Sequence, residues 1–180
     1  MKIAITGHSR GIGKSLFDSL SKEHECAGFS RSNGFDISQQ QDSIVQEVIN
    51  NDVFVNNAYQ GMEQVNILNK VWKFWSRDPN KTIVNISSLS KYPGLSNNAS
   101  GYSAHKAALS HQAFILMFKD NSRKCRMINV NPGYVKTDMN VSAHDKANML
   151  TPQECADIIA WAINQPQHIE IGELSLWRPF

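Results

Sequence analysis

Short apolar segments alternate along this chain with segments whose apolar residues recur at intervals of three or four. Segments of the first kind are typical of buried strands, and those of the second kind are typical of helices with one buried face. Residues 11–21 show the helical spacing, with Ile12, Leu16, Phe17 and Leu20 on one face. The pattern predicts strands at residues 3–6, 26–30, 52–56, 81–87, 126–130 and 169–177, and helices at residues 11–21, 38–49, 64–76, 102–119 and 152–163.

Residues that favour helix starts precede two of these helices. Ser38 is predicted to be the N-cap of the second helix, with Gln41 at the position where a capping box closes. Thr151 is predicted to cap the last helix, because Pro152 then occupies the first helical position, where proline is favoured. Each cap predicts the residue at which its helix begins.

The order of these elements indicates the fold class. Strands that alternate with helices form a parallel sheet that helices cover on both faces. Because crossovers between parallel strands are right-handed, we predict an α/β fold with a doubly wound, Rossmann-like sheet. A chain of 180 residues can bury a sizeable core in one unit, so residues 1–180 are expected to form a single domain.

Three glycines follow the first predicted strand and open the first helix. They are Gly7, which directly follows Thr6, and then Gly11 and Gly13. The first glycine permits a tight turn, the second lets the backbone approach a phosphate, and the third lets the helix pack on the strand. The helix N-terminus then presents free N–H groups and its positive dipole end to an anion. This strand–turn–helix arrangement predicts a binding site for the pyrophosphate of a dinucleotide.

Arginines stand beside this loop at positions where an acid would favour a different cofactor. Arg10 lies inside the glycine loop, and Arg31 follows the second predicted strand. An Asp or Glu there would bind the adenosine ribose hydroxyls of NAD, whereas an arginine suits the 2′-phosphate of NADP. The residues therefore predict NADPH or NADP as the cofactor.

Charge and composition argue against several other classes of protein. The formal net charge is +2 and the basic residues are scattered, so no nucleic-acid partner is expected. No apolar run approaches the roughly 20 residues of a membrane span, and the apolar start of the chain is shorter than a signal peptide. Cys26, Cys125 and Cys155 lie far apart, which argues against disulfides and a metal site. We expect a cytoplasmic protein without a metal.

Four motifs resemble those of the short-chain dehydrogenase/reductase family. Three residues separate Gly7 from Gly11, which is the spacing of that family's glycine loop. All four motifs occur in the family's order, and they identify the chain as an unusually short member. The other three are Asn56-Asn57-Ala58 after the third predicted strand, Ile86-Ser87-Ser88 followed by Tyr102 and Lys106, and Pro132-Gly133-Tyr134-Val135-Lys136-Thr137.

The resemblance implies a catalytic group. It makes Tyr102 the general acid that protonates a carbonyl oxygen, and Lys106 the residue that lowers the tyrosine pKa and holds the nicotinamide ribose. Four positions separate these residues, so they share one face of the predicted helix. Ser88 is implied as the hydrogen-bond donor to the substrate oxygen, and Ser87 is its rival.

The fourth catalytic position and two neighbouring positions fit the family less regularly. The family has an asparagine on the preceding helix, which anchors a water in the proton relay. Asn66 resembles it, and Asn69 is the alternative. Tyr59 stands where the family has the glycine of Asn-Asn-Ala-Gly, and His105 stands where it has a small residue.

The resemblance also implies a set of cofactor-binding residues. Asp36 and Ile37 resemble the family's Asp-Val pair beside the adenine, although Asp36 also fits as a residue that merely precedes a helix cap. The complete implied set is Gly7, Ser9, Arg10, Ile12, Gly13, Arg31, Asp36, Ile37, Asn56, Asn57, Ala58, Tyr102, Lys106, Pro132, Gly133, Val135 and Thr137.

The connection after the second predicted strand is too short for the family's usual topology. A parallel crossover needs a dozen or more residues, and the chain from Arg31 to Asp36 has no room for a helix. We therefore expect the family's third strand and its preceding helix to be missing or vestigial. Residues 26–30 should then form a sheet edge, and the strand order should be 2-1-4-5-6-7 in the family's labels.

The predicted function is the NADPH-dependent reduction of a ketone or aldehyde to an alcohol, or the reverse reaction. The substrate would be a small molecule. The alternative is a non-catalytic NADP(H)-binding sensor of the same fold, but such proteins typically lack the tyrosine–lysine pair that is present here. Aromatic residues around Trp72 and Phe114 lie on helices through which family members commonly dimerise, so a homodimer is expected.

Overall fold

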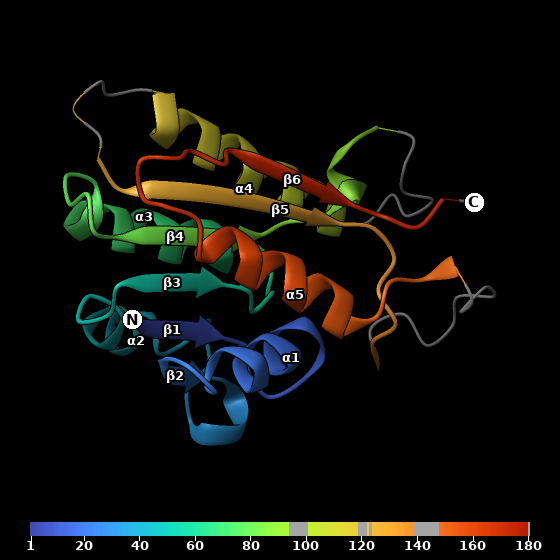
Figure 1. The fold of residues 1–180 in the computed structure, drawn as a ribbon, viewed down its shortest axis with the longest axis horizontal. Coiled ribbons are helices and arrows are strands. Elements are labelled where there is room, and N and C mark those ends of the chain that lie inside the picture. The colour runs from blue at the N-terminus through green and yellow to red at the C-terminus, as the bar shows by residue number, and fades with distance from the viewer. Residues whose placement is uncertain (94–100, 119–121, 123, 139–147, 180) are drawn as a thin grey trace.

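A parallel β-sheet forms the middle layer of the structure. The computed structural model describes residues 1–93, 101–118, 122, 124–138 and 148–179. Within these residues, six parallel strands lie in the order β2-β1-β3-β4-β5-β6 (Figure 1), which confirms the predicted order with β2 at an edge. The strands are β1 (Lys2–Thr6), β2 (Glu25–Phe29), β3 (Val53–Asn56), β4 (Thr82–Ile86), β5 (Arg126–Pro132) and β6 (Glu173–Leu176).

Helices cover both faces of this sheet. Helices α1 (Gly11–Leu20) and α5 (Pro152–Ile163) lie on one face, in front of the sheet in Figure 1. Helices α2 (Gln41–Val48), α3 (Glu63–Trp75) and α4 (Gly101–Phe118) lie on the other face. The single Rossmann-like α/β domain is therefore confirmed. Among the helices that the structure describes, none is both long enough and apolar enough to cross a bilayer.

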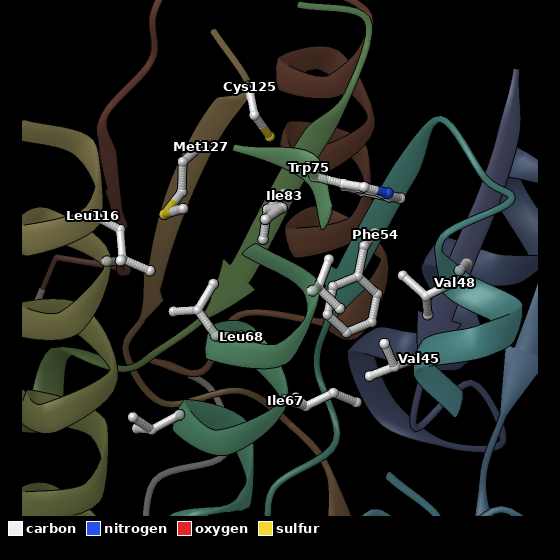
Figure 2. Packing of buried hydrophobic residues seen from close by; sticks show 14 of the residues in the cluster. Val45, Val48, Phe54, Ile67, Leu68, Trp75, Ile83, Leu116, Cys125 and Met127 are labelled. Atoms are coloured by element: carbon white, nitrogen blue, oxygen red, sulfur yellow. The ribbon is translucent and has the colours of Figure 1, made fainter. Parts of the chain in front are cut away.

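Alternating side chains of the strands supply two hydrophobic cores, one on each face of the sheet. In β3, Val53 and Val55 pack with α1 and α5, whereas Phe54 packs with α2, α3 and α4. Figure 2 shows the core between the sheet and helices α2, α3 and α4. There Phe54 lies among apolar side chains that include Leu68 and Trp75 of α3. Because both faces are covered, the strands consist of nearly continuous apolar residues.

A single 3-10 turn, Arg31–Asn33, connects the edge strand β2 to the segment before α2. Every residue of this connection is described, and it contains neither an α-helix nor a strand. The Gly28 carbonyl lies on the free side of β2, because the neighbouring Phe29 carbonyl accepts from Gly7 N. Asn33 Nδ2 donates to the Gly28 oxygen at 2.8 Å, so a side-chain amide takes the place of a neighbouring strand at this point.

One predicted helix start is wrong and the other is confirmed. Helix α2 begins at Gln41, and Ser38 instead donates from its N–H and its Oγ to Asp36 Oδ1, at 2.8 and 2.7 Å. A carboxylate accepts these donors more strongly than a serine hydroxyl would cap a helix, which explains the later start. Thr151 does cap α5 through a capping box with Glu154. The predicted end of α4 at Lys119 lies outside the described residues.

Candidate active site

Strands β1, β3, β4 and β5 end beside a cavity of about 1130 Å³. Its walls are the glycine loop after β1, the turn after β2 and the segments that follow β3, β4 and β5. Ligands of doubly wound sheets bind at this carboxyl edge. Most of the predicted site residues line the cavity, namely Gly7, Ser9, Arg10, Ile12, Arg31, Asp36, Ile37, Asn57, Ala58, Ser88, Tyr102, Lys106, Pro132, Gly133, Val135 and Thr137.

The glycine loop adopts a backbone conformation that depends on its glycines. Gly7 and Gly11 adopt positive φ angles of 73° and 55°, which other residues rarely adopt. Gly13 does not line the cavity but packs under the turn, where a Cβ would lie 2.3 Å from the Gly7 oxygen. Arg10 precedes α1 in extended backbone and makes no side-chain capping bond in the structure. The N–H groups of the first helical turn therefore remain free to bind a phosphate.

The two asparagines after β3 have different surroundings. Asn57 Nδ2 donates to the Thr6 oxygen at 2.9 Å, so Asn57 ties the end of β3 to the start of the glycine loop. Asn56 is buried and is not among the residues that line the cavity, so the structure gives no support for its predicted role in cofactor binding. Its Nδ2 donates to the Gln64 oxygen at 2.9 Å and to Asn85 Oδ1 at 3.1 Å. Its position at the buried end of β3, on the side of α3, turns the side chain into the core.

The end of the cavity lining that follows β1 and β2 contains two basic side chains and one acid. Arg10 and Arg31 are exposed residues of this lining, which also includes Asp36 and the buried Ile37. Hydrogen bonds from Ser38 hold the pKa of the Asp36 carboxyl below its usual value, and the nearby Arg31 charge acts in the same direction. This end can accept an anionic group beside an apolar surface.

Ser88, which follows β4, lies close to Tyr102 of α4. The interaction between their hydroxyl groups lowers the pKa of the Tyr102 phenol, while burial is the larger effect and raises it. Ser88 Oγ also accepts from the Ser90 N–H and hydroxyl, at 3.1 and 2.8 Å. Ser87 Oγ instead donates to the Lys106 carbonyl oxygen at 3.0 Å and lies 2.8 Å from Ser110 Oγ. The geometry thus favours Ser88 over Ser87 as the partner of the tyrosine.

Lys106 is buried one helical turn after Tyr102. Its Nζ lies 5.6 Å from the centroid of the Tyr102 ring and donates to Gln64 Oε1 and to the Ile86 oxygen, both at 2.7 Å. Burial lowers the pKa of this amine to about 7. The Ser88 hydroxyl, the Tyr102 phenol and the Lys106 amine therefore lie on the wall of the same cavity as the glycine loop.

A family model for short chain dehydrogenases matches residues 26–148 of the chain, which is more than half of its length. The chain belongs to the short-chain dehydrogenase/reductase family. The matched part begins in β2 and contains Ser88, Tyr102 and Lys106, whereas the glycine loop precedes it. A search of curated proteins finds no match.

Solved structures of dehydrogenases and reductases share the fold of this chain. The 3-alpha-hydroxysteroid dehydrogenase of Pseudomonas sp. B-0831, complexed with NADH, is 21% identical, with a TM-score of 0.80 over 98% of this chain and 95% of that one. An alcohol dehydrogenase of Thermococcus sibiricus with 5-hydroxy-NADP is 19% identical, with a TM-score of 0.77 over 99% and 97%. A 3-ketoacyl-(acyl-carrier-protein) reductase of Brucella melitensis with NADH is 17% identical, with a TM-score of 0.81 over 97% and 96%.

The two departures from the short-chain dehydrogenase pattern contact each other. The Tyr59 hydroxyl lies 3.0 Å from Nδ1 of His105. The Tyr59 ring stands nearly perpendicular to the Tyr102 ring, with the centroids 4.8 Å apart, and Lys106 Nζ lies 5.2 Å from the Tyr59 centroid. Burial raises the pKa of the Tyr59 phenol. The large side chain at the family's glycine position therefore packs against the tyrosine–lysine pair and forms part of the cavity wall.

Neither asparagine proposed for the fourth catalytic position reaches the cavity. Asn66 is exposed on α3, and its Nδ2 donates to Glu63 Oε2 at 3.1 Å on the same helix. Asn69 accepts from Gln112 Nε2 of α4 at 2.7 Å. Because Asn66 follows the buried Val65 at the edge of the apolar stripe, it points to solvent, and its predicted role is not supported.

Sequence reasoning missed Gln64, which is the α3 side chain that reaches Lys106. Gln64 is 2% exposed and shares the buried face of α3 with Ile67, Leu68 and Val71, at helical intervals of three, four and seven. A polar residue within an apolar stripe was the available signal, because buried polar groups require hydrogen-bond partners. The family comparison directed attention to asparagine and away from this glutamine.

Proposed function

We propose that this chain is an NADPH-dependent oxidoreductase that interconverts a ketone or aldehyde with an alcohol. The observation that carries the proposal is the position of Ser88, Tyr102 and Lys106 on the wall of the same cavity as the glycine loop. Family membership supports an oxidoreductase. Solved structures that share the fold hold NADH in some cases and NADPH or NADP in others, so the choice between the two cofactors rests on this chain's own residues.

The residues of the cavity fit a dinucleotide in a defined direction. The free N–H groups at the start of α1 would hold the pyrophosphate, and Arg10 and Arg31 would bind the adenosine 2′-phosphate. Asp36 and Ile37 would flank the adenine. The nicotinamide end would then lie near Tyr102, beside the residues after β3 and β5, which are Asn57, Ala58, Pro132, Gly133, Val135 and Thr137.

The bound cofactor supplies the hydride, and the protein handles the proton and the developing charge. In reduction, the Tyr102 hydroxyl gives its proton to the carbonyl oxygen as that oxygen becomes an alkoxide. Ser88 donates a second hydrogen bond to the same oxygen, which stabilises the negative charge. The ammonium of Lys106 favours the phenolate that remains on Tyr102. In oxidation the same groups act in reverse, with the phenolate as the base.

Cofactor choice is tested by calorimetric titration of the protein with NADPH and with NADH. NADPH is expected to bind more tightly, because each charge-assisted contact to the phosphate contributes roughly 1.5–3 kcal/mol. Arg10→Ala and Arg31→Ala should each weaken NADPH binding about tenfold or more and leave NADH binding nearly unchanged. Arg77→Ala, at an exposed position outside the cavity lining, is the matched control. Equal affinity for both cofactors would contradict the NADPH assignment.

The chemistry is tested with Tyr102→Phe after a screen of ketones and aldehydes with NADPH. The variant keeps the ring and loses the proton, so folding and NADPH binding should survive. Turnover should fall about 10²–10⁴-fold, which is the usual contribution of general acid catalysis. Steady-state assays beside direct NADPH titration measure the two effects separately. Near-normal turnover of Tyr102→Phe would overturn the mechanism, and NADPH binding without turnover on any substrate would favour the sensor alternative.

A further inference from the structure

The Lys106 amine is held by atoms from two other elements. Gln64 of α3 provides Oε1 and Ile86 at the end of β4 provides its carbonyl oxygen, each 2.7 Å from Lys106 Nζ. An ammonium has three N–H donors, so these two bonds leave one for a ligand in the cavity that Lys106 lines. Within the described residues, Gln64 is the side chain that accepts from Lys106.

The orientation of the Gln64 amide is fixed by its own donors. Gln64 Nε2 donates to the Asn56 oxygen at 2.8 Å and to the Ile86 oxygen at 3.3 Å. With the NH₂ group bound to two carbonyls, the amide oxygen must point to Lys106. Asn56 returns a hydrogen bond from its Nδ2 to the main-chain oxygen of Gln64 at 2.9 Å. Both the side chain and the main chain of Gln64 are thus hydrogen-bonded to Asn56 at the end of β3.

We infer that Gln64 is the positioning residue that holds Lys106 toward the cavity and supports its ammonium form. The inference rests on the proposed function, in which that ammonium acts on Tyr102. It assigns to a direct amide contact the place for which the family uses an asparagine and a water, and for which Asn66 was the predicted residue. A glutamine suits this contact because asparagine is one methylene shorter and would leave its oxygen out of reach of Nζ.

Other titratable groups around Lys106 affect how the pH dependence of a Gln64 variant is interpreted. The rings of Tyr59 and Tyr102 face Nζ at centroid distances of 5.2 and 5.6 Å, and His105 bonds to the Tyr59 hydroxyl. All three can titrate, so a pH profile alone would mix their effects with that of the lysine. A measurement on the lysine itself is therefore required.

The decisive experiment is an NMR titration of the cofactor-free protein with ¹³Cε-labelled lysine. The Lys106 signal is identified by its loss in Lys106→Met. In Gln64→Glu a carboxylate replaces the amide oxygen beside Nζ, and the titration midpoint of Lys106 should rise by about one pH unit or more. In Gln64→Leu and Gln64→Asn the acceptor is lost or withdrawn, and the midpoint should fall. Gln46→Leu, at an exposed position of α2, should leave it unchanged.

Thermal unfolding shows whether each variant is folded. If Gln64→Leu does not fold, Gln64→Glu still tests the inference. With an accepted substrate, the pH profile of kcat for Gln64→Glu should move in the same direction as the NMR midpoint. An unchanged Lys106 midpoint in folded Gln64→Glu would overturn the inference, whatever the enzyme's activity. A wild-type protein without turnover would instead count against the proposed function, and the NMR titration would still decide the role of Gln64.

Discussion

At the scale of single residues, the buried amine of Lys106 is unfavourable for stability. Burial lowers its pKa from the ordinary 10.5 to about 7. The oxygens of Gln64 and Ile86 and the rings of Tyr59 and Tyr102 favour the charged form, yet desolvation remains the larger effect. Near neutral pH, the cofactor-free protein therefore holds Lys106 partly as a neutral amine. Burial of this lysine therefore costs stability.

This lysine predicts a pH dependence of stability. Its pKa is lower in the folded than in the unfolded protein, so between about pH 7 and 10.5 the unfolded chain binds more protons. The free energy of unfolding should therefore rise with pH in this window, by at most about 1.4 kcal/mol per pH unit, and this contribution should be constant below it. Lys106→Met has an apolar side chain of similar length and should lose the dependence.

Urea unfolding of wild type and Lys106→Met, without cofactor, measures the effect between about pH 6 and pH 9. Groups other than Lys106 contribute to both proteins and cancel in the difference. That difference should be flat near pH 6 and should then shift in favour of the wild type as the pH rises. A difference that stays constant up to pH 9 would mean that Lys106 keeps an ordinary pKa in the folded protein.

At the scale of elements, the sequence predicted those features that depend on a single turn, helix or connection. The glycines at 7, 11 and 13 could be assigned because their roles follow from a single turn. Tyr102 and Lys106 could be paired because one helix places them on one face. The short connection after β2 could be predicted from its length, since no helix fits between Arg31 and Asp36.

Most of what the sequence reasoning missed depends on contacts between elements. Ser38 is an exception, because the acceptor of its donors is Asp36, two residues earlier in the same connection. Asn56 is adjacent in sequence to Asn57, but its amide joins a buried row across three strands. In that row Asn56 Nδ2 donates to Asn85 Oδ1 at 3.1 Å, and Asn85 Nδ2 donates to Asn129 Oδ1 at 3.2 Å. The strand register that aligns these three residues is a property of the folded sheet.

Helix α3 shows within one element the difference between features that local sequence determines and features that packing determines. Its apolar stripe was visible in the sequence, and the helix bounds were predicted within one residue at each end. Which polar residue of α3 faces Lys106 depends on how the helix is rotated against α4 and β4. Gln64 lies on the packed face and Asn66 on the solvent face, two positions apart. A prediction based on residue type chose the asparagine, whereas one based on helical phase would have chosen the glutamine.

At the scale of the whole molecule, the helical layer of α2, α3 and α4 carries exposed aromatic side chains on α3 and α4. Phe74 of α3 and Phe118 of α4 are 57% and 74% exposed, and Phe114 stacks on Phe118 with the ring centroids 6.0 Å apart. Trp75 and Met117, by contrast, are buried in the core of the same layer. The aromatic content of these helices therefore divides into core residues and an apolar surface that a second copy can cover.

We predict a homodimer through this surface of α3 and α4. Light scattering at micromolar concentration should give twice the 20.2 kDa mass of the chain. Phe74→Glu combined with Phe114→Glu places charges where the interface would bury apolar rings, so the double variant should be a monomer with unchanged thermal unfolding at low concentration. Trp161→Glu, at an exposed position on α5 across the sheet, is the control and should remain a dimer. A monomeric wild type would refute the dimer, and a double variant that stays dimeric would move the interface away from α3 and α4.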